Sequence, residues 1–120
     1  MNLLNLEDEK FKNVKVLGYS FKIKFISPKD RLEIARRRVF LQGGCSIEAL
    51  TDGDYAFMEN IAILDTCIEE SPKDFPDNES SENWDSLELI NAVAHEIRKH
   101  TDDIESRLKK NKPLDGGSES

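Results

Sequence analysis

The residues that come nearest to a metal-binding or catalytic pattern are His95, Glu96 and His100, in the order H-E-x-x-x-H. Zinc proteases carry H-E-x-x-H on a helix, where histidines four residues apart share one face. Five residues turn an α-helix by about 500°, so His95 and His100 would lie about 140° apart. We therefore interpret them as two surface histidines and expect no metal ion.

The other reactive residue types also lack the spacing of a known site. Cys45 and Cys67 are too few for a disulfide framework, and neither has a sequence-adjacent histidine, so we expect reduced thiols. The acids at 69–77 do not alternate as in a calcium loop, and no Gly-Lys-Ser/Thr follows the Gly-Gly pair at 43–44. The sequence predicts a protein that is not an enzyme and uses no cofactor.

The charge is distributed unevenly along the 120 residues. Residues 1–40 carry ten Lys/Arg against five Asp/Glu, and residues 41–120 carry seven against nineteen, which gives a net charge of -7. This polarity can steer partners or pair one end of the molecule with another molecule. It disfavours nucleic acid as the main ligand, and the chain has no apolar run of membrane-spanning length.

The elements that would position any site begin with a β-hairpin. On both sides of Gly18, apolar residues alternate with lysines, as in half-buried strands, which predicts a hairpin over residues 11–26. A two-stranded ribbon is only marginally stable alone, so its apolar face must lie on a helix or on another copy.

The Ser-Pro-Lys-Asp sequence at 27–30 predicts a helix start, because serine caps and proline suits the first helical position. The helix is expected over residues 28–42, and the glycines at 43–44 end it. Its apolar face consists of Leu32, Ala35, Val39 and Phe40. The consecutive arginines at 36–38 fan around the helix, so we expect them to be solvated or salt-bridged there.

The most apolar segment predicts a central helix over residues 52–70. Its apolar residues surround most of the helix: Tyr55, Phe57, Met58, Ile61, Ala62, Ile63, Leu64 and Ile68. A helix that is apolar on so many sides is usually buried by its neighbours. Thr51 or Asp52 would cap its start, and Pro72 would end it.

The last segment, residues 84–110, begins with Trp84 and carries apolar residues at alternating spacings of three and four. This heptad pattern suits packing against neighbouring helices, including the central one. Because polar residues at 100–103 can interrupt it, the segment is expected to form one helix or two. Together the segments predict an α+β fold: an N-terminal β-hairpin followed by three to four mainly antiparallel α-helices. Residues 1–110 would form one mostly helical domain, and residues 111–120 a disordered tail.

Three stretches of the chain resemble the tail assembly chaperones of long-tailed (siphovirus-type) bacteriophages. They are SPKDRLEIARRRVFLQGG at 27–44, DYAFMENIAILDTCIEESPKDF at 54–75 and NWDSLELINAVAHEI at 83–97. The likeness covers roughly residues 20–108. It rests on the arginine-bearing helix closed by two glycines, the apolar helix that runs into Ser71-Pro72, and Trp84 with its following helix.

That resemblance implies a non-enzymatic protein of the host bacterial cytoplasm that is not expected in the mature virion. Members of the family bind the tape measure protein, the long helical chain that sets tail length, and keep it soluble until the tube polymerises. They self-associate, and a longer frameshifted form is often made. The frameshifted form and the tail tube protein are therefore further expected partners.

Two apolar sets are the candidate surface for the client and for self-association. They are Phe21, Ile23 and Phe25 on the hairpin and Leu87, Ile90, Ile97 and Ile104 on the last helix. The alternative is that both sets are ordinary core. A second functional interpretation is a small cytoplasmic protein-binding adaptor or regulator that uses the basic hairpin and the first helix. An enzyme with an unrecognised site is the third.

Overall fold

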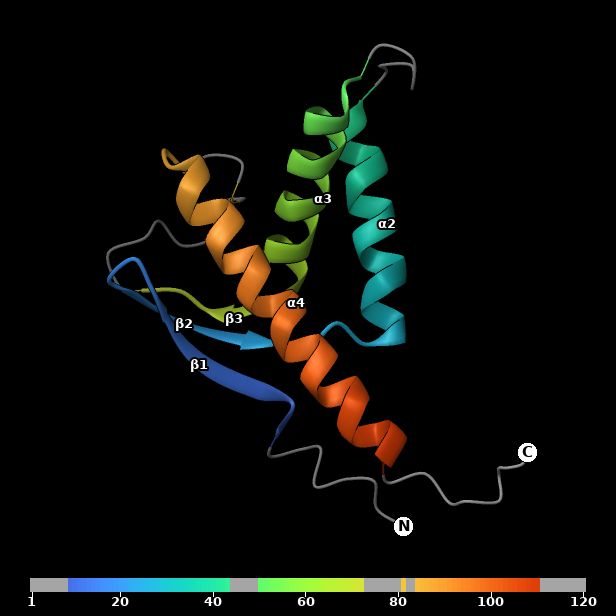
Figure 1. The fold of residues 1–120 in the computed structure, drawn as a ribbon. Helices are drawn as coiled ribbons and strands as arrows, with labels where there is room; N and C mark the ends of the chain where they lie inside the picture. The colour runs from blue at the N-terminus through green and yellow to red at the C-terminus, as the bar shows by residue number, and fades with distance from the viewer. Residues whose placement is uncertain (1–8, 44–49, 73–80, 82–83, 111–120) are drawn as a thin grey trace, which may run out of the picture.

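The computed structural model describes residues 9–43, 50–72, 81 and 84–110 (Figure 1). Its elements occur in the order β1 (Phe11–Val16), β2 (Tyr19–Lys24), α2 (Pro28–Gln42), α3 (Asp52–Cys67), β3 (Ile68–Glu70) and α4 (Leu87–Lys110). The α+β fold class is confirmed, because the β1–β2 hairpin comes first and three helices follow within the described residues. The expected tail at 111–120 lies outside these residues.

The hairpin turns at Leu17 and Gly18, which both have a positive φ, 51° and 88°. Two such residues form the short turn whose twist matches that of the flanking strands. The resulting register places Val14 opposite Phe21. Phe21 and Ile23, two alternate residues of β2, face the core and are buried.

β3 pairs with β2, so β2 is the central strand of the sheet. The sequence predicted that the central helix would run to residue 70, but α3 ends three residues earlier, where Ile68 becomes extended (φ −88°, ψ 118°). Ile68 pairs with Ile23 and Glu70 with Lys22 in the ladder. The pairing of β3 with β2 therefore ends α3 before Pro72 is reached. Ile68 suits this position because a β-branched residue fits a strand well.

Both α2 and α3 start with a capping box. The Asp30 backbone N–H donates to Ser27 Oγ at 3.2 Å, and the Ser27 N–H donates to the Asp30 carboxylate at 3.1 Å. Thr51 and Asp54 exchange the same two bonds at the start of α3. The caps satisfy backbone donors that the first helical turn leaves open, which fixes where each helix begins.

α4 is one continuous helix, without the break that the sequence allowed at 100–103. The Ile26 N–H donates to Thr101 Oγ1 at 2.8 Å, and this hydroxyl donates to the Ile97 carbonyl oxygen at 2.8 Å. The buried threonine therefore joins α4 to the segment after β2 while it stays helical.

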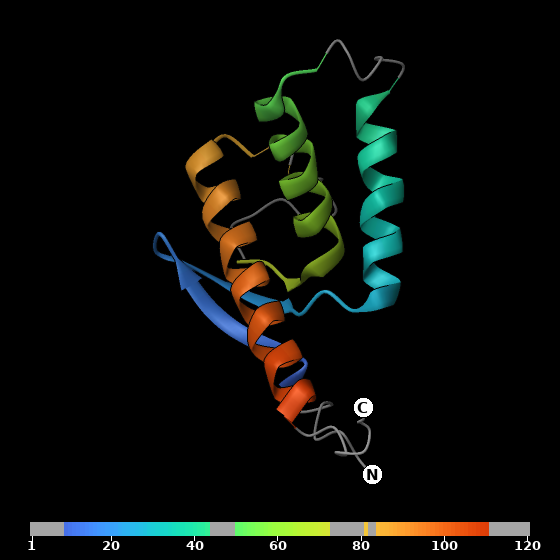
Figure 2. The same cartoon turned by 45° about the vertical axis from the view of Figure 1, so that its right-hand side comes forward.

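The core lies between α3, α4 and one face of the sheet (Figure 1, Figure 2). α4 lies across the sheet, α3 packs beside α4, and α2 lies on the other side of α3 (Figure 2). α3 is thus central, and its buried residues are Met58, Asn60, Ile61, Ala62, Ile63, Leu64 and Cys67. The buried residues of α2 are Asp30 and Ile34, so this helix contacts the protein along one narrow side.

Candidate functional site

Most of the residues that the sequence offered as a client surface belong to the core. The buried ones, each at most 2% exposed, are Phe21, Ile23, Ile90, Ile97 and Ile104. Phe25 is half-buried, and Leu87 is 57% exposed. The structure therefore leaves no continuous apolar surface on these two sets of residues.

The apolar face of the hairpin is covered because α4 lies across it (Figure 1). Trp84, which was expected to open the last helix, precedes α4 and stacks on Phe21, with ring centroids 5.7 Å apart. The heptad residues of α4 pack on α3 and the sheet. For five of the seven candidate residues, the structure therefore has the alternative that the sequence left open, which is ordinary core.

Exposed apolar side chains gather instead on α2. Leu32, Val39 and Phe40 are 61, 62 and 71% exposed, and Ala35 beside them is half-buried. We call these four residues the outer α2 face. They are the apolar face that the sequence assigned to this helix, but they point to solvent, because α2 packs on α3 through the opposite side, where Ile34 is buried.

The outer α2 face has a regular geometry. Seven residues turn a helix by about 700°, so Leu32 and Val39 lie within about 20° of one line along α2. Lys29 and Arg36, also seven residues apart and exposed, form a parallel row about 60° around the helix. Glu33, the nearest acid of α2, lies about 100° from Leu32. Phe40 lies about 80° from Leu32 on the same side as the positive row, so this row runs between Phe40 and the row of Leu32 and Val39.

Other arginines of α2 fix the helix to its neighbours, as a salt-bridged surface was expected to do. Arg37 Nε donates to the Asp65 carboxylate of α3 at 3.0 Å. Arg38 donates to Glu59 of α3 at 2.9 Å. Arg31 donates to an acid of α4 at 3.0 Å. These bonds link α2 to its neighbours, and the buried Ile34 packs into the core on the inward side of the helix.

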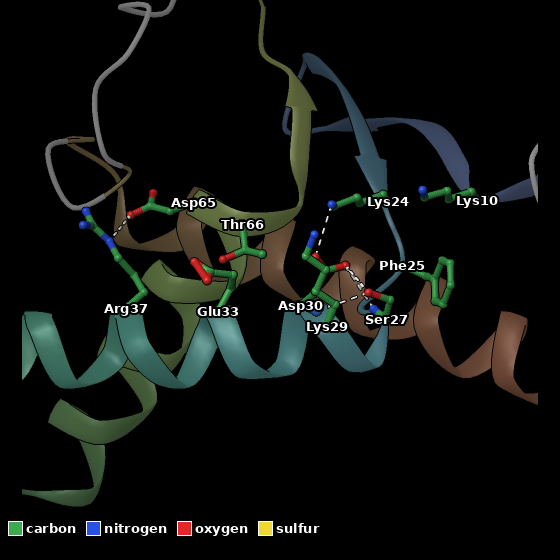
Figure 3. Close-up of a pocket in the computed structure, with 10 residues that line it drawn as sticks. All are labelled: Lys10, Lys24, Phe25, Ser27, Lys29, Asp30, Glu33, Arg37, Asp65 and Thr66. Atoms are coloured by element: carbon green, nitrogen blue, oxygen red, sulfur yellow. Dashed lines mark hydrogen bonds and ion pairs between the residues drawn. The ribbon is translucent and has the colours of Figure 1, made fainter.

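An open groove of about 740 Å³ lies between the end of β2, the start of α2 and the end of α3 (Figure 3). Its lining residues are Lys10, Lys24, Phe25, Ser27, Lys29, Asp30, Glu33, Arg37, Asp65 and Thr66. Lys24 Nζ lies 3.2 Å from the Asp30 carboxylate, and Figure 3 shows this pair and the pair of Arg37 with Asp65 along the groove. Because these opposite charges pair with each other, we interpret the groove as a structural junction at which ion pairs connect β2, α2 and α3.

Asp30 is the buried carboxylate of this groove. Burial raises its pKa, but hydrogen bonds from the backbone and side chain of Ser27 and from Lys24, with the charge of Lys24, outweigh burial. The pKa of Asp30 is therefore lowered from its ordinary value. The ionised carboxylate ties β2 to the first turn of α2.

Cys67 and His100 are both buried. Burial, with a smaller contribution from the charge of Asp30, raises the pKa of the Cys67 thiol to about 12, so Cys67 acts as a small apolar residue at neutral pH. His100 Nε2 lies 3.1 Å from the Lys10 carbonyl oxygen. The expectation of two surface histidines is thus wrong for His100 and right for His95. In the described part of the chain, no three His, Cys, Asp or Glu side chains are grouped to hold a metal ion.

None of the described helices is both long enough and apolar enough to cross a membrane. The chain was compared with models of protein families, with curated proteins and with solved structures. None of the three comparisons found a match.

Proposed function

We propose that this protein is a non-catalytic phage tail assembly chaperone that binds the tape measure protein and keeps it soluble during tail morphogenesis. The observation that carries the proposal is the outer α2 face, a regular row of exposed apolar residues on a protein with a complete core elsewhere. The resemblance of residues 20–108 to these chaperones supports the choice of client.

A protein that holds an amphipathic helix needs an exposed apolar surface and enough charge to stay dispersed when it is loaded. The outer α2 face supplies the first requirement. Residues 41–120, with nineteen Asp/Glu against seven Lys/Arg, supply the second. In this proposal the protein acts in the host bacterial cytoplasm, self-associates along the client and leaves before the virion is mature.

Further partners in this proposal are a frameshifted longer form and the tail tube protein. Neither nucleic acid nor a membrane is needed, since the client is a protein and the acidic part of the chain repels phosphates.

A second candidate is a small adaptor or regulator that binds one protein through the hairpin and the first helix. The observation that favours it is the exposed positive charge of Lys12 and Lys15 on β1, an edge strand of the sheet. The two functions differ in stoichiometry. An adaptor binds one short segment in a fixed ratio, whereas a chaperone coats a long chain in many copies.

The test is co-expression with the long helical protein encoded just downstream in the same locus. The chaperone proposal predicts that this client becomes soluble and co-purifies with many copies of the protein, counted by light scattering of the complex. A fixed one-to-one complex would favour the adaptor. An insoluble client with no complex would overturn the chaperone proposal.

A further inference from the structure

We infer that the outer α2 face binds an amphipathic helix whose apolar row is bordered on one side by acidic residues. The inference rests on the proposed function and deepens it, because it names the surface that binds and the chemistry of the client segment. It follows from three features of α2: its fixed orientation, the spacing of its apolar row and the sign of the charges beside that row.

The outward orientation of α2 is held from several sides. Arg37 and Arg38 bind acids of α3, and Arg31 binds an acid of α4. The capping box and the buried Ile34 fix the start and the inward side of the helix. A rotation that hid the outer face would expose the buried Ile34 and break the less exposed pair of Arg37 with Asp65. The apolar row is therefore a built feature of the folded protein.

The spacing of the row selects a helix as the occupant. Leu32 and Val39 are two turns apart, about 10.5 Å along the axis, which is the repeat at which packed helices interdigitate. Phe40 lies about 100° around the helix from Val39, and the Arg37 guanidinium lies 5.1 Å from its ring centroid. A partner helix with apolar residues at i, i+3 or i+4, and i+7 fits this row.

The charges beside the row select the acidic border. Among the described residues Lys29 makes no ion pair, and Arg36 pairs with Glu33 of the same helix. That pair is 69% and 54% exposed, so it is weak and can be exchanged for a new partner. Carboxylates seven residues apart on an incoming helix would meet Lys29 and Arg36 together.

A second copy of the chain fits this surface less well. An antiparallel pair of α2 helices from two copies would match the apolar rows but would bring the two positive rows together, which is unfavourable. In the described residues outside α2, the exposed large apolar side chains are Leu17, Tyr19, Phe57 and Leu87. They lie on the hairpin, α3 and α4 and form no heptad-spaced row on one helix. The occupant that matches both the row and its charge is a segment of another protein.

The experiment uses two fluorescein-labelled helical peptides of about 20 residues, long enough to form a helix on binding. They share the same apolar heptad positions, and one carries Glu where the other carries Lys beside them. Anisotropy titration of the folded full chain should give binding of the Glu peptide at least about tenfold tighter than the Lys peptide. The preference should weaken as salt is added, because it is carried by exposed charges.

The variants Leu32→Glu and Val39→Glu should each weaken binding of the Glu peptide by at least about tenfold. Leu87→Glu, the same change at a similarly exposed leucine on α4, should leave it unchanged. The double variant Lys29→Glu/Arg36→Glu should reverse the preference between the peptides. Circular dichroism would verify that each variant is folded, and all five positions are exposed enough to accept the change.

Equal affinity for both peptides, no binding of the Glu peptide to the wild type, or full binding by Val39→Glu would overturn the inference. A wild-type dimer that Val39→Glu dissociates would also overturn it, because a second copy would then occupy the face. The proposed function fails separately. If Val39→Glu still solubilises the tape measure protein, the surface is wrong and the chaperone stands. If the wild type binds the Glu peptide but leaves the client insoluble, the surface stands and the chaperone is wrong.

Discussion

α2 and α4 are both amphipathic helices, but they use their apolar residues in opposite ways. α4 buries most of its heptad residues, so that Ile90, Ile97 and Ile104 are almost fully covered. α2 buries a single apolar residue, Ile34, and exposes Leu32 and its neighbours on the other side.

The difference arises because α2 has two apolar sides. Ile34 and Leu41 lie on the side that packs on α3, and Leu32 and Val39 lie on the side opposite. α3 can cover only one side, and the inward side also carries Asp30, which binds Lys24 in the groove. Apolar and polar contacts thus both lie on the inward side, and the other apolar side is left outward. α4 has a single apolar stripe, and α3 and the sheet cover it.

The largest expected effect is on the free energy of unfolding, which should respond differently to substitutions in α4 and in α2. Ile97→Ala on α4 should lower the free energy of unfolding by about 2–5 kcal/mol, because it opens a cavity in the core. Val39→Ala on α2 should change it by less than about 0.5 kcal/mol. Urea denaturation followed by circular dichroism measures both. A large loss for Val39→Ala would mean that the outer α2 face is covered in solution.

The next effect concerns the hydrogen bond that α4 makes to the segment between β2 and α2. Thr101→Val should cost about 1–3 kcal/mol of stability, because it leaves the buried Ile26 N–H without its acceptor. Thr101→Ser keeps the hydroxyl and serves as the matched control, with a loss of about 1 kcal/mol from the missing methyl group. Equal losses for the two variants would mean that packing, and not this bond, holds α4 there.

A smaller effect is expected at the inward side of α2. The pKa of Asp30 in the folded protein is lowered from an ordinary value of 3.8, so its ionised form stabilises the fold above that pH. The contribution is lost as the pH falls through the folded pKa. Asp30→Asn should reduce stability by about 1–2 kcal/mol at pH 7. Denaturation at several pH values should show the gap to the wild type closing as the pH falls below 3.8, and a constant gap would contradict the role of the charge.

The smallest expected effect is the slow reaction of the Cys67 thiol, at the end of α3, with a thiol reagent. In a Cys45→Ser background, Cys67 should react slowly with Ellman's reagent at pH 8, because burial raises the pKa of its thiol to about 12. Addition of urea should release the full absorbance of one thiol. Prompt reaction without urea would mean that α3 is more open than the core described for it.

Much of the fold could be predicted from local signals. The turn at Gly18, the capping serine at 27 and the alternation in β2 act over a few residues, and each is found where the sequence placed it. The end of α3 could not be predicted in this way, because Ile68 leaves the helix to pair with Ile23, 45 residues earlier in the chain. Local spacing carries no information about that partner.

The candidate site was harder to predict, because hydrophobic spacing identifies an apolar face without saying what covers it. The pattern of Ile90 and Ile97 was read correctly as a face, but its cover, α3 and the sheet, is a tertiary property. A usable signal existed for α2: its apolar residues are interleaved in the sequence with basic residues. That mixture is typical of a half-exposed helix and distinguishes α2 from the apolar α3.

The central claim is that the client binds to the outer α2 face. Thiol labelling of the protein in complex with the client tests this claim most directly. Val39→Cys and Leu87→Cys, each in a Cys45→Ser background, would be treated with maleimide before and after assembly with the tape measure protein. The thiol introduced at position 39 should react rapidly in the unloaded protein and at least about tenfold more slowly in the complex, while the one at position 87 keeps its rate. An unchanged rate at position 39 in a complex that has formed would contradict binding through α2.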